Sequence, residues 1–144
     1  MAQLDEKTLK AIAASARAAL ESLTGGNDPM FSAFPRGACG PATELIGRFL
    51  TEHHGLQGFY VCGIGHSQLE REQSHAWAEF GPYIVDLTHD QIADTGIIGW
   101  VLPKTSEWHS QFRRKKPREG FCTPENWPTY PHRAYGVLLS HLLP

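Results

Sequence analysis

The chain has 144 residues, of which 41% are hydrophobic and 19% charged, and its formal net charge is −2 with eight neutral histidines. This composition predicts one globular domain over residues 1–144 and excludes a disordered chain. The charge does not favour a nucleic-acid partner, and no apolar stretch reaches the length of a transmembrane helix. Three cysteines without a C-x-x-C pair argue against a disulfide scaffold and a structural zinc site. We therefore expect a cytoplasmic protein that binds neither nucleic acid nor membrane and needs no metal or organic cofactor.

Two helices are predicted in the first part of the chain. Apolar residues recur at helical spacing over residues 9–23, and Asp5 is placed to cap that helix. The second helix is predicted over residues 39–54, because Pro41 is tolerated only in a first turn and Gly55 is a typical stop. The first residue of this second helix is Cys39, which lies between the small residues Ala38 and Gly40.

Strands are predicted to follow these helices. Residues 58–64 are rich in aromatic and β-branched side chains, and residues 74–80 and 83–88 form two runs separated by a two-residue turn. Beyond residue 96, scattered prolines indicate irregular structure with short elements. The basic run over residues 113–119, "RRKKPRE", is predicted to be a solvated loop.

The hairpin brings a histidine and a carboxylate together. Successive side chains of a strand alternate between two faces, so His75, Trp77 and Glu79 share one face. With a two-residue turn, Asp86 lies diagonally across from His75, within reach of its side chain. A carboxylate on one ring nitrogen orients the imidazole and leaves the other nitrogen free to act as a base.

Cys39 is the candidate nucleophile for this base. At a helix N-terminus a thiolate is stabilised by free backbone amides and by the helix dipole, and an adjacent imidazolium stabilises it further. Gly37 and Gly40 leave room for a substrate near the sulfur, and the backbone N–H of Cys39 can donate to an oxyanion. Trp77 and Glu79 complete the set of candidate substrate-pocket residues.

Two strings, "ACGPATELIGRFL" and "HAWAEFGPYIVDLT", resemble the Cys-His-Asp core of the transglutaminase-like branch of the papain-like superfamily. The resemblance implies an α+β fold in which N-terminal helices, including the nucleophile helix, pack on an antiparallel sheet. It implies that Cys39 is the nucleophile, His75 the base and Asp86 the orienting acid, acting on a protein or peptide. The chain departs from the pattern at Gly40, where many relatives carry Trp. It also lacks the Gln that papain-like enzymes place before the Cys as an oxyanion donor.

The expected chemistry is acyl transfer at an amide or ester carbonyl through a Cys thioester. With water as acceptor the protein is a peptidase or a protein-glutamine deamidase, and with an amine it is a transglutaminase. Two alternatives stay open: a non-catalytic binding or regulatory protein that retains the fold, and an acetyl-CoA-dependent acyltransferase. The latter group also has an Arg-Gly pair before its Cys, which Arg36-Gly37 matches, although its members are longer. The sequence does not determine the oligomeric state.

Overall fold

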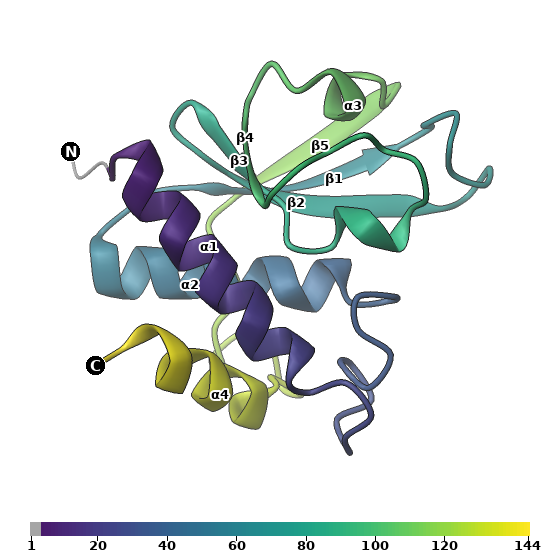
Figure 1. The fold of residues 1–144 in the computed structure, drawn as a ribbon. Coiled ribbons are helices and arrows are strands. Elements are labelled where there is room, and N and C mark those ends of the chain that lie inside the picture. The colour runs from purple at the N-terminus through teal and green to yellow at the C-terminus, as the bar shows by residue number, and fades with distance from the viewer. Residues whose placement is uncertain (1–3) are drawn as a thin grey trace.

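A computed structural model describes residues 4–144 as an antiparallel five-stranded sheet with helices on both faces (Figure 1). The helices are α1 (Glu6–Glu21), α2 (Cys39–His54), α3 (Glu107–Ser110) and α4 (His132–Leu142), with a short 3₁₀ turn, η1 (His89–Gln91). The strands are β1 (Phe59–Ile64), β2 (Ser74–Phe80), β3 (Tyr83–Val85), β4 (Val101–Pro103) and β5 (Arg114–Glu119). The α+β class and the antiparallel sheet predicted from the sequence are confirmed.

The two N-terminal helices form where the sequence signals place them. Asp5 caps α1, since its side chain accepts a hydrogen bond of 2.7 Å from the backbone N–H of Thr8. Helix α2 runs over the predicted residues 39–54 and ends at Gly55, whose φ of +65° suits glycine. Helix α2 lies between the sheet and helix α4 (Figure 1). Its first residue, Cys39, therefore lies on the side of the sheet that faces the long helices.

The strand order is β4-β3-β2-β1-β5, and every neighbouring pair is antiparallel. Phe80 pairs with Tyr83, so the hairpin between β2 and β3 has the predicted two-residue turn. Strand β3 is shorter than predicted, because it ends at Val85 and its last partner in β2 is Ala78. The first half of β2, which carries His75, therefore pairs with β1 but not with β3.

The sheet buries both of its faces. On the face toward α1, α2 and α4, residues Ala78, Phe80 and Val85 join the main core. On the opposite face, a smaller core is formed by Val61, Trp77, Ile84, Trp108 and Phe112. The second core exists because α3 and the segment after it cover this face. Three hairpin side chains on this face, those of His75, Trp77 and Ile84, are therefore shielded from solvent.

The C-terminal third differs most from the prediction. The basic run is not a loop: it forms β5, which pairs with β1 and is the edge strand of the sheet. All of its side chains are exposed, so no alternation of apolar and polar residues marks it as a strand. No helix in the described part of the chain is long and apolar enough to cross a bilayer.

Candidate active site

Cys39 is the first residue of α2 and is half-buried. No side chain caps this helix N-terminus, and within residues 4–144 no backbone carbonyl accepts from the N–H of Cys39. The thiol therefore lies at the positive end of a 16-residue helix, beside a backbone donor that is available to a ligand.

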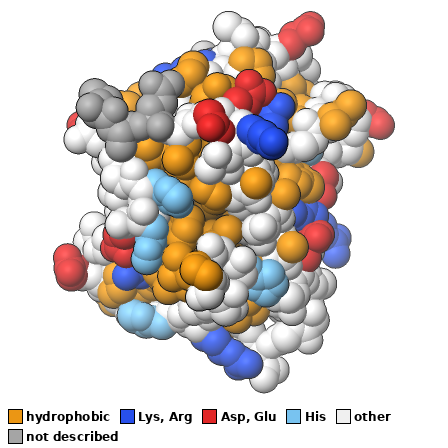
Figure 2. Space-filling model, turned by 60° about the vertical axis from the view of Figure 1, so that its left-hand side comes forward, with side chains coloured by type: hydrophobic (Ala, Val, Ile, Leu, Met, Phe, Trp, Pro, Cys, Tyr) orange, Lys and Arg blue, Asp and Glu red, His pale blue; other side chains and the backbone are white. Residues whose placement is uncertain are grey.

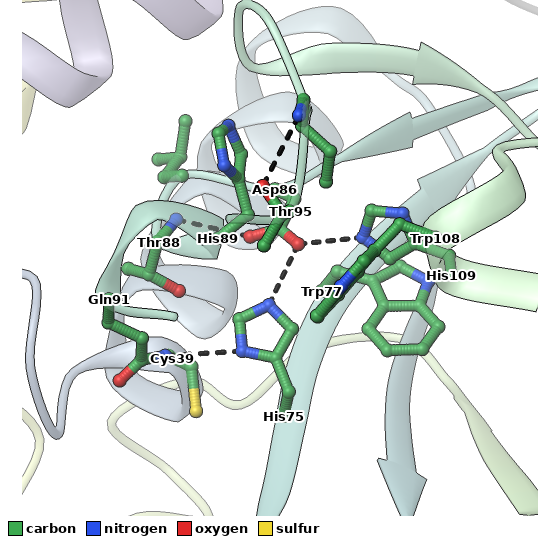
Figure 3. A network of polar contacts seen from close by, with 12 residues as sticks. Cys39, His75, Trp77, Asp86, Thr88, His89, Gln91, Thr95, Trp108 and His109 are labelled. Carbon is green, nitrogen blue, oxygen red and sulfur yellow. Dashed lines mark hydrogen bonds and ion pairs between the residues drawn. The ribbon is translucent and has the colours of Figure 1, made fainter. Parts of the chain in front are cut away.

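His75 and Asp86 form the buried pair that the hairpin register predicts. The Nε2 atom of His75 lies 2.8 Å from Oδ2 of Asp86, and both side chains are fully buried. Asp86 follows β3 directly and is held there because its N–H donates to the carbonyl of Trp100 and its Oδ1 accepts from the N–H of Thr88. Figure 3 shows the carboxylate on one side of the imidazole and the Cys39 sulfur on the side of the other ring nitrogen.

The charges of this cluster shift its pKa values in opposite directions. Burial opposes a charged imidazole, but the charge and hydrogen bond of Asp86 outweigh burial and raise the pKa of His75 to about 10. Burial also opposes ionisation of the Cys39 thiol, but hydrogen bonding to His75, its positive charge and the N–H of Ala76 together lower the pKa of the thiol. The site therefore favours a thiolate next to an imidazolium.

Gln91 was not predicted from the sequence. Its Nε2 lies 3.1 Å from Nδ1 of His75, and its Oε1 accepts from the N–H of Gly37 at 3.3 Å. The same side chain also hydrogen-bonds to the thiol and helps to lower the pKa of Cys39. Gln91 belongs to turn η1, which follows Asp86 after only a few residues. This closeness in sequence to the predicted acid is the one sequence feature that could have indicated Gln91 as a site residue.

His109 is a second unpredicted member of the network. Its Nε2 lies 2.8 Å from Oδ2 of Asp86, the same oxygen that binds His75, and its Nδ1 lies 2.7 Å from the hydroxyl of Ser106. Burial lowers the pKa of His109 despite the carboxylate, so it is neutral and donates from Nε2. Because Ser106 caps α3, the short helix fixes this second donor. No sequence pattern links His109 to a carboxylate 23 residues earlier.

The same three residues are the one group of potential metal ligands in the described chain. Atoms of His75, Asp86 and His109 lie within 4.8 Å of one another, and nitrogen and carboxylate ligands suit Zn²⁺. However, both nitrogen–oxygen distances are 2.8 Å, whereas ligands about 2.1 Å from a tetrahedral zinc are separated by about 3.4 Å. The distances are those of hydrogen bonds, which is the arrangement that orients an imidazole.

The two glycines predicted beside the sulfur lie there, and each has a structural reason. Gly37 has a φ of +71° and donates to Gln91. A Cβ at Gly40 would lie 3.2 Å from the hydroxyl of Tyr60, so Tyr60 occupies the space next to the residue after the nucleophile. Burial and the nearby charge of Cys39 raise the pKa of Tyr60 to about 12, which keeps its hydroxyl protonated.

Trp77 and Glu79, the other two candidate pocket residues, differ in exposure. The Trp77 ring is fully buried in the second core, 6.0 Å from the ring of His75, and its Nε1 donates to Glu79 at 3.0 Å. Glu79 is only partly buried and also faces Lys104 at 3.7 Å. Trp77 therefore packs beside the imidazole as a core residue, and contact of either side chain with a substrate stays a prediction.

The chain matches no protein-family model, no curated protein and no solved structure at a significant level. Its function is therefore inferred from the geometry and electrostatics of the site.

Proposed function

We propose that this chain is a thiol-dependent acyl-transfer enzyme that acts on amide bonds of proteins or peptides. The observation that carries the proposal is the buried His75–Asp86 pair, oriented so that the second ring nitrogen of His75 faces a half-buried thiol at a helix N-terminus. A buried carboxylate fixes the imidazole, and helix and imidazolium activate the thiol. The fold and the order Cys, His, Asp also agree with a papain-like or transglutaminase-like member. We assign the activity to the cytoplasm, where free cysteines persist.

The first half-reaction forms a thioester. The Cys39 thiolate attacks the amide carbonyl, and the carbonyl π electrons move to the oxygen. This oxyanion lies near the backbone N–H of Cys39 and the side-chain amide of Gln91, which supply two hydrogen-bond donors. When the C–N bond breaks, the imidazolium of His75 transfers the proton on Nδ1 to the leaving nitrogen, and ammonia or an amine departs.

The second half-reaction regenerates the thiol. The neutral Nδ1 of His75 takes a proton from water or from an acceptor amine as that group attacks the thioester. The C–S bond then breaks, its electrons return to sulfur, and the thiolate–imidazolium pair forms again. Asp86 remains ionised throughout, because its neighbours hold the pKa of its carboxyl well below the usual range. Water as acceptor gives hydrolysis or deamidation, and an amine gives a cross-link.

An electrophilic probe tests the proposal most directly. Wild-type protein is treated with a peptide-linked vinyl sulfone or chloroacetamidine at pH 6, and the modified residue is identified by mass spectrometry. We expect rapid modification at Cys39 and none in Cys39→Ala. The matched control is Cys62→Ala, which removes another free, half-buried thiol and leaves labelling intact.

Two results would contradict the proposal. Labelling that is no faster at Cys39 than at the two other thiols would indicate a non-catalytic protein. A stable 42-dalton adduct formed with acetyl-CoA, together with inertness toward peptides, would indicate the acetyltransferase alternative.

A further inference from the structure

The basic run is placed on the sheet in a way that its sequence does not reveal. Residues 113–118 contain five cationic side chains and no acidic one: Arg113, Arg114, Lys115, Lys116 and Arg118. All are exposed, and four of them lie on β5, the edge strand next to β1. By contrast, the face shown in Figure 2 mixes acidic and basic side chains. The cations of β5 are therefore a local concentration of positive charge in a chain of net charge −2.

The pairing of the strands connects this charge to the candidate active site. Ile64 of β1 pairs with Ser74, the residue before His75, and on its other side with Arg114. Two residues further along β1, Cys62 lies between Ala76 and Lys116. Neighbouring strands are about 4.8 Å apart, so the backbone of Arg114 lies about 10 Å from that of Ser74. Arg114, Lys116 and Arg118 share the face of Ile64, Cys62 and Tyr60, on which α2 packs, whereas Lys115 shares the face of Gly63 and His75.

A surface hollow marks the same place. It has a volume of about 440 Å³ and lies at the end of β1, and its lining residues are Ile64, Gly65, Arg71, Glu72, Arg113 and Arg114. Three of these side chains are arginines and one is acidic. The hollow lies on the β1–β5 side of the sheet, at the end of β1 that pairs with the start of β2, so β1 lies between it and the strand that carries His75.

Most of these cations have no role in holding the fold together. Arg118 binds Glu44 at 2.6 Å and lies over the ring of Tyr60. Among the residues that the structure describes, no carboxylate lies within 4.0 Å of a charged nitrogen of Arg113, Arg114, Lys115 or Lys116. Their charge is available to a partner.

We propose that the cations of β5 and the adjacent hollow bind an acidic segment of the polypeptide whose amide reacts at Cys39. The inference rests on the proposed function for the identity of the reacting group. An extended peptide advances about 3.4 Å per residue, so a span of about 10 Å places the acidic residues two to four positions from the reacting residue. Carboxylates at alternate positions of such a peptide have the same spacing as Arg114 and Lys116.

A polypeptide fits this surface better than a nucleic acid does. In the proposed reaction the Cys39 thiol attacks an amide carbonyl carbon, and a polypeptide contains such a group at every residue. Binding of single-stranded nucleic acid also uses aromatic rings on which bases stack. Of the two rings of β1 beside this row, that of Tyr60 is already covered by the guanidinium of Arg118 at 4.5 Å, which leaves Phe59 as a single exposed ring and not a series on which successive bases could stack.

Binding is tested on Cys39→Ala, so that turnover does not enter. The probe is a fluorescein-labelled peptide with one Gln and with Glu at the second, third and fourth positions on each side; its neutral counterpart has Ser in place of Glu. We expect fluorescence anisotropy to show at least tenfold tighter binding of the acidic peptide at low salt. Adding Arg114→Gln and Lys116→Gln removes most of that preference, whereas Lys7→Gln with Arg133→Gln, on α1 and α4, leaves it intact.

Three outcomes would overturn the inference. Equal affinity for both peptides would show that the cations do not select the partner. Loss of solubility in the β5 variant without any change in binding would indicate that the charges only protect an edge strand from association. Tight binding of a labelled oligonucleotide that depends on β5, without binding of the acidic peptide, would assign the surface to nucleic acid. The probe labelling of Cys39 remains a separate result, so the surface and the chemistry can fail independently.

Discussion

Replacing Asp86 by asparagine should abolish the reactive thiolate while keeping the fold. The carboxylate accepts three hydrogen bonds: one from the N–H of Thr88 and one each from Nε2 of His75 and of His109. Asparagine has the same shape but only one acceptor oxygen. If that oxygen faces the two imidazoles, the amide NH₂ group faces the N–H of Thr88. If the amide is turned over, its NH₂ group faces both imidazoles. In either orientation a buried donor is left without an acceptor, which costs about 1–3 kcal/mol of stability.

The loss of charge matters more than the loss of the acceptor. The charge and hydrogen bond of Asp86 contribute most to the raised pKa of His75, Cys39 adds to them, and burial acts in the opposite direction. Without the carboxylate, burial of the imidazole is opposed only by Cys39, and the pKa of His75 falls. Each tenfold change in this protonation equilibrium corresponds to about 1.4 kcal/mol of lost stabilisation of the imidazolium. Turnover should therefore fall by about 10³–10⁴, similar to the effect of removing the acid in a serine triad.

The pH dependence of alkylation measures this effect without a known substrate. For the wild type, the rate of iodoacetamide labelling at Cys39 should form a plateau that extends below neutrality, because the pKa of the thiol is lowered. In Asp86→Asn the rate should instead rise only toward pH 8.5, as for an ordinary thiol. The matched control is Asp94→Asn, an exposed position with a φ of +62° that asparagine tolerates. A folded Asp86→Asn variant that still labels at the wild-type rate at pH 6 would refute the reasoning.

Four further predictions concern the surroundings of the triad. Gln91→Ala should lower kcat about 10²-fold with little change in KM, as expected for an oxyanion donor, and should move the start of the alkylation plateau to higher pH, because Gln91 helps to lower the pKa of the thiol; an unchanged kcat would exclude this role. His109→Gln should keep activity and an alkylation plateau that extends below neutrality, since the glutamine amide can still donate to Asp86; loss of that plateau would contradict this. Asp90→Asn should cost about 1 kcal/mol in thermal unfolding, because Asp90 binds the buried guanidinium of Arg17 through both oxygens; unchanged melting would contradict this. Finally, because the pKa of Asp86 is lower in the folded chain than in the unfolded one, its stabilisation is present above about pH 4 and disappears as the pH falls, which melting curves between pH 2 and 7 would show.

The part of the site that the sequence could predict depends on local rules. Strand alternation and a two-residue turn were sufficient to place Asp86 diagonally across from His75, and the observed register confirms the turn. Pro41 and Gly55 were sufficient to place Cys39 at a helix start. Beyond the hairpin, contacts are long-range: Thr88 makes no capping hydrogen bond to turn η1, and Asp90 binds Arg17 of α1.

The remaining part depends on packing between distant segments. Gln91 and His109 come from a short turn and a four-residue helix, in which no periodic pattern indicates the direction of a side chain. Strand β5 has both faces in solvent, so its sequence resembles that of a loop, and pairing with β1 alone determines its structure. Trp77 was assigned to a pocket because alternation predicts which side chains share a face but not what covers that face.

The position of Gln91 connects the charge state of His75 to the oxyanion donors. The N–H of Gly37 holds Oε1 of Gln91, so the NH₂ group of the amide faces Nδ1 of His75. A neutral imidazole can accept that hydrogen bond, but an imidazolium carries a proton on Nδ1 and cannot. When the thiolate–imidazolium pair forms, the amide must therefore leave Nδ1, and the sulfur of Cys39 is an acceptor within its reach, because hydrogen bonding by Gln91 contributes to the lowered pKa of the thiol. In the proposed reaction, proton transfer from thiol to imidazole would thus free a donor beside the attacking sulfur at the moment when the oxyanion first requires one.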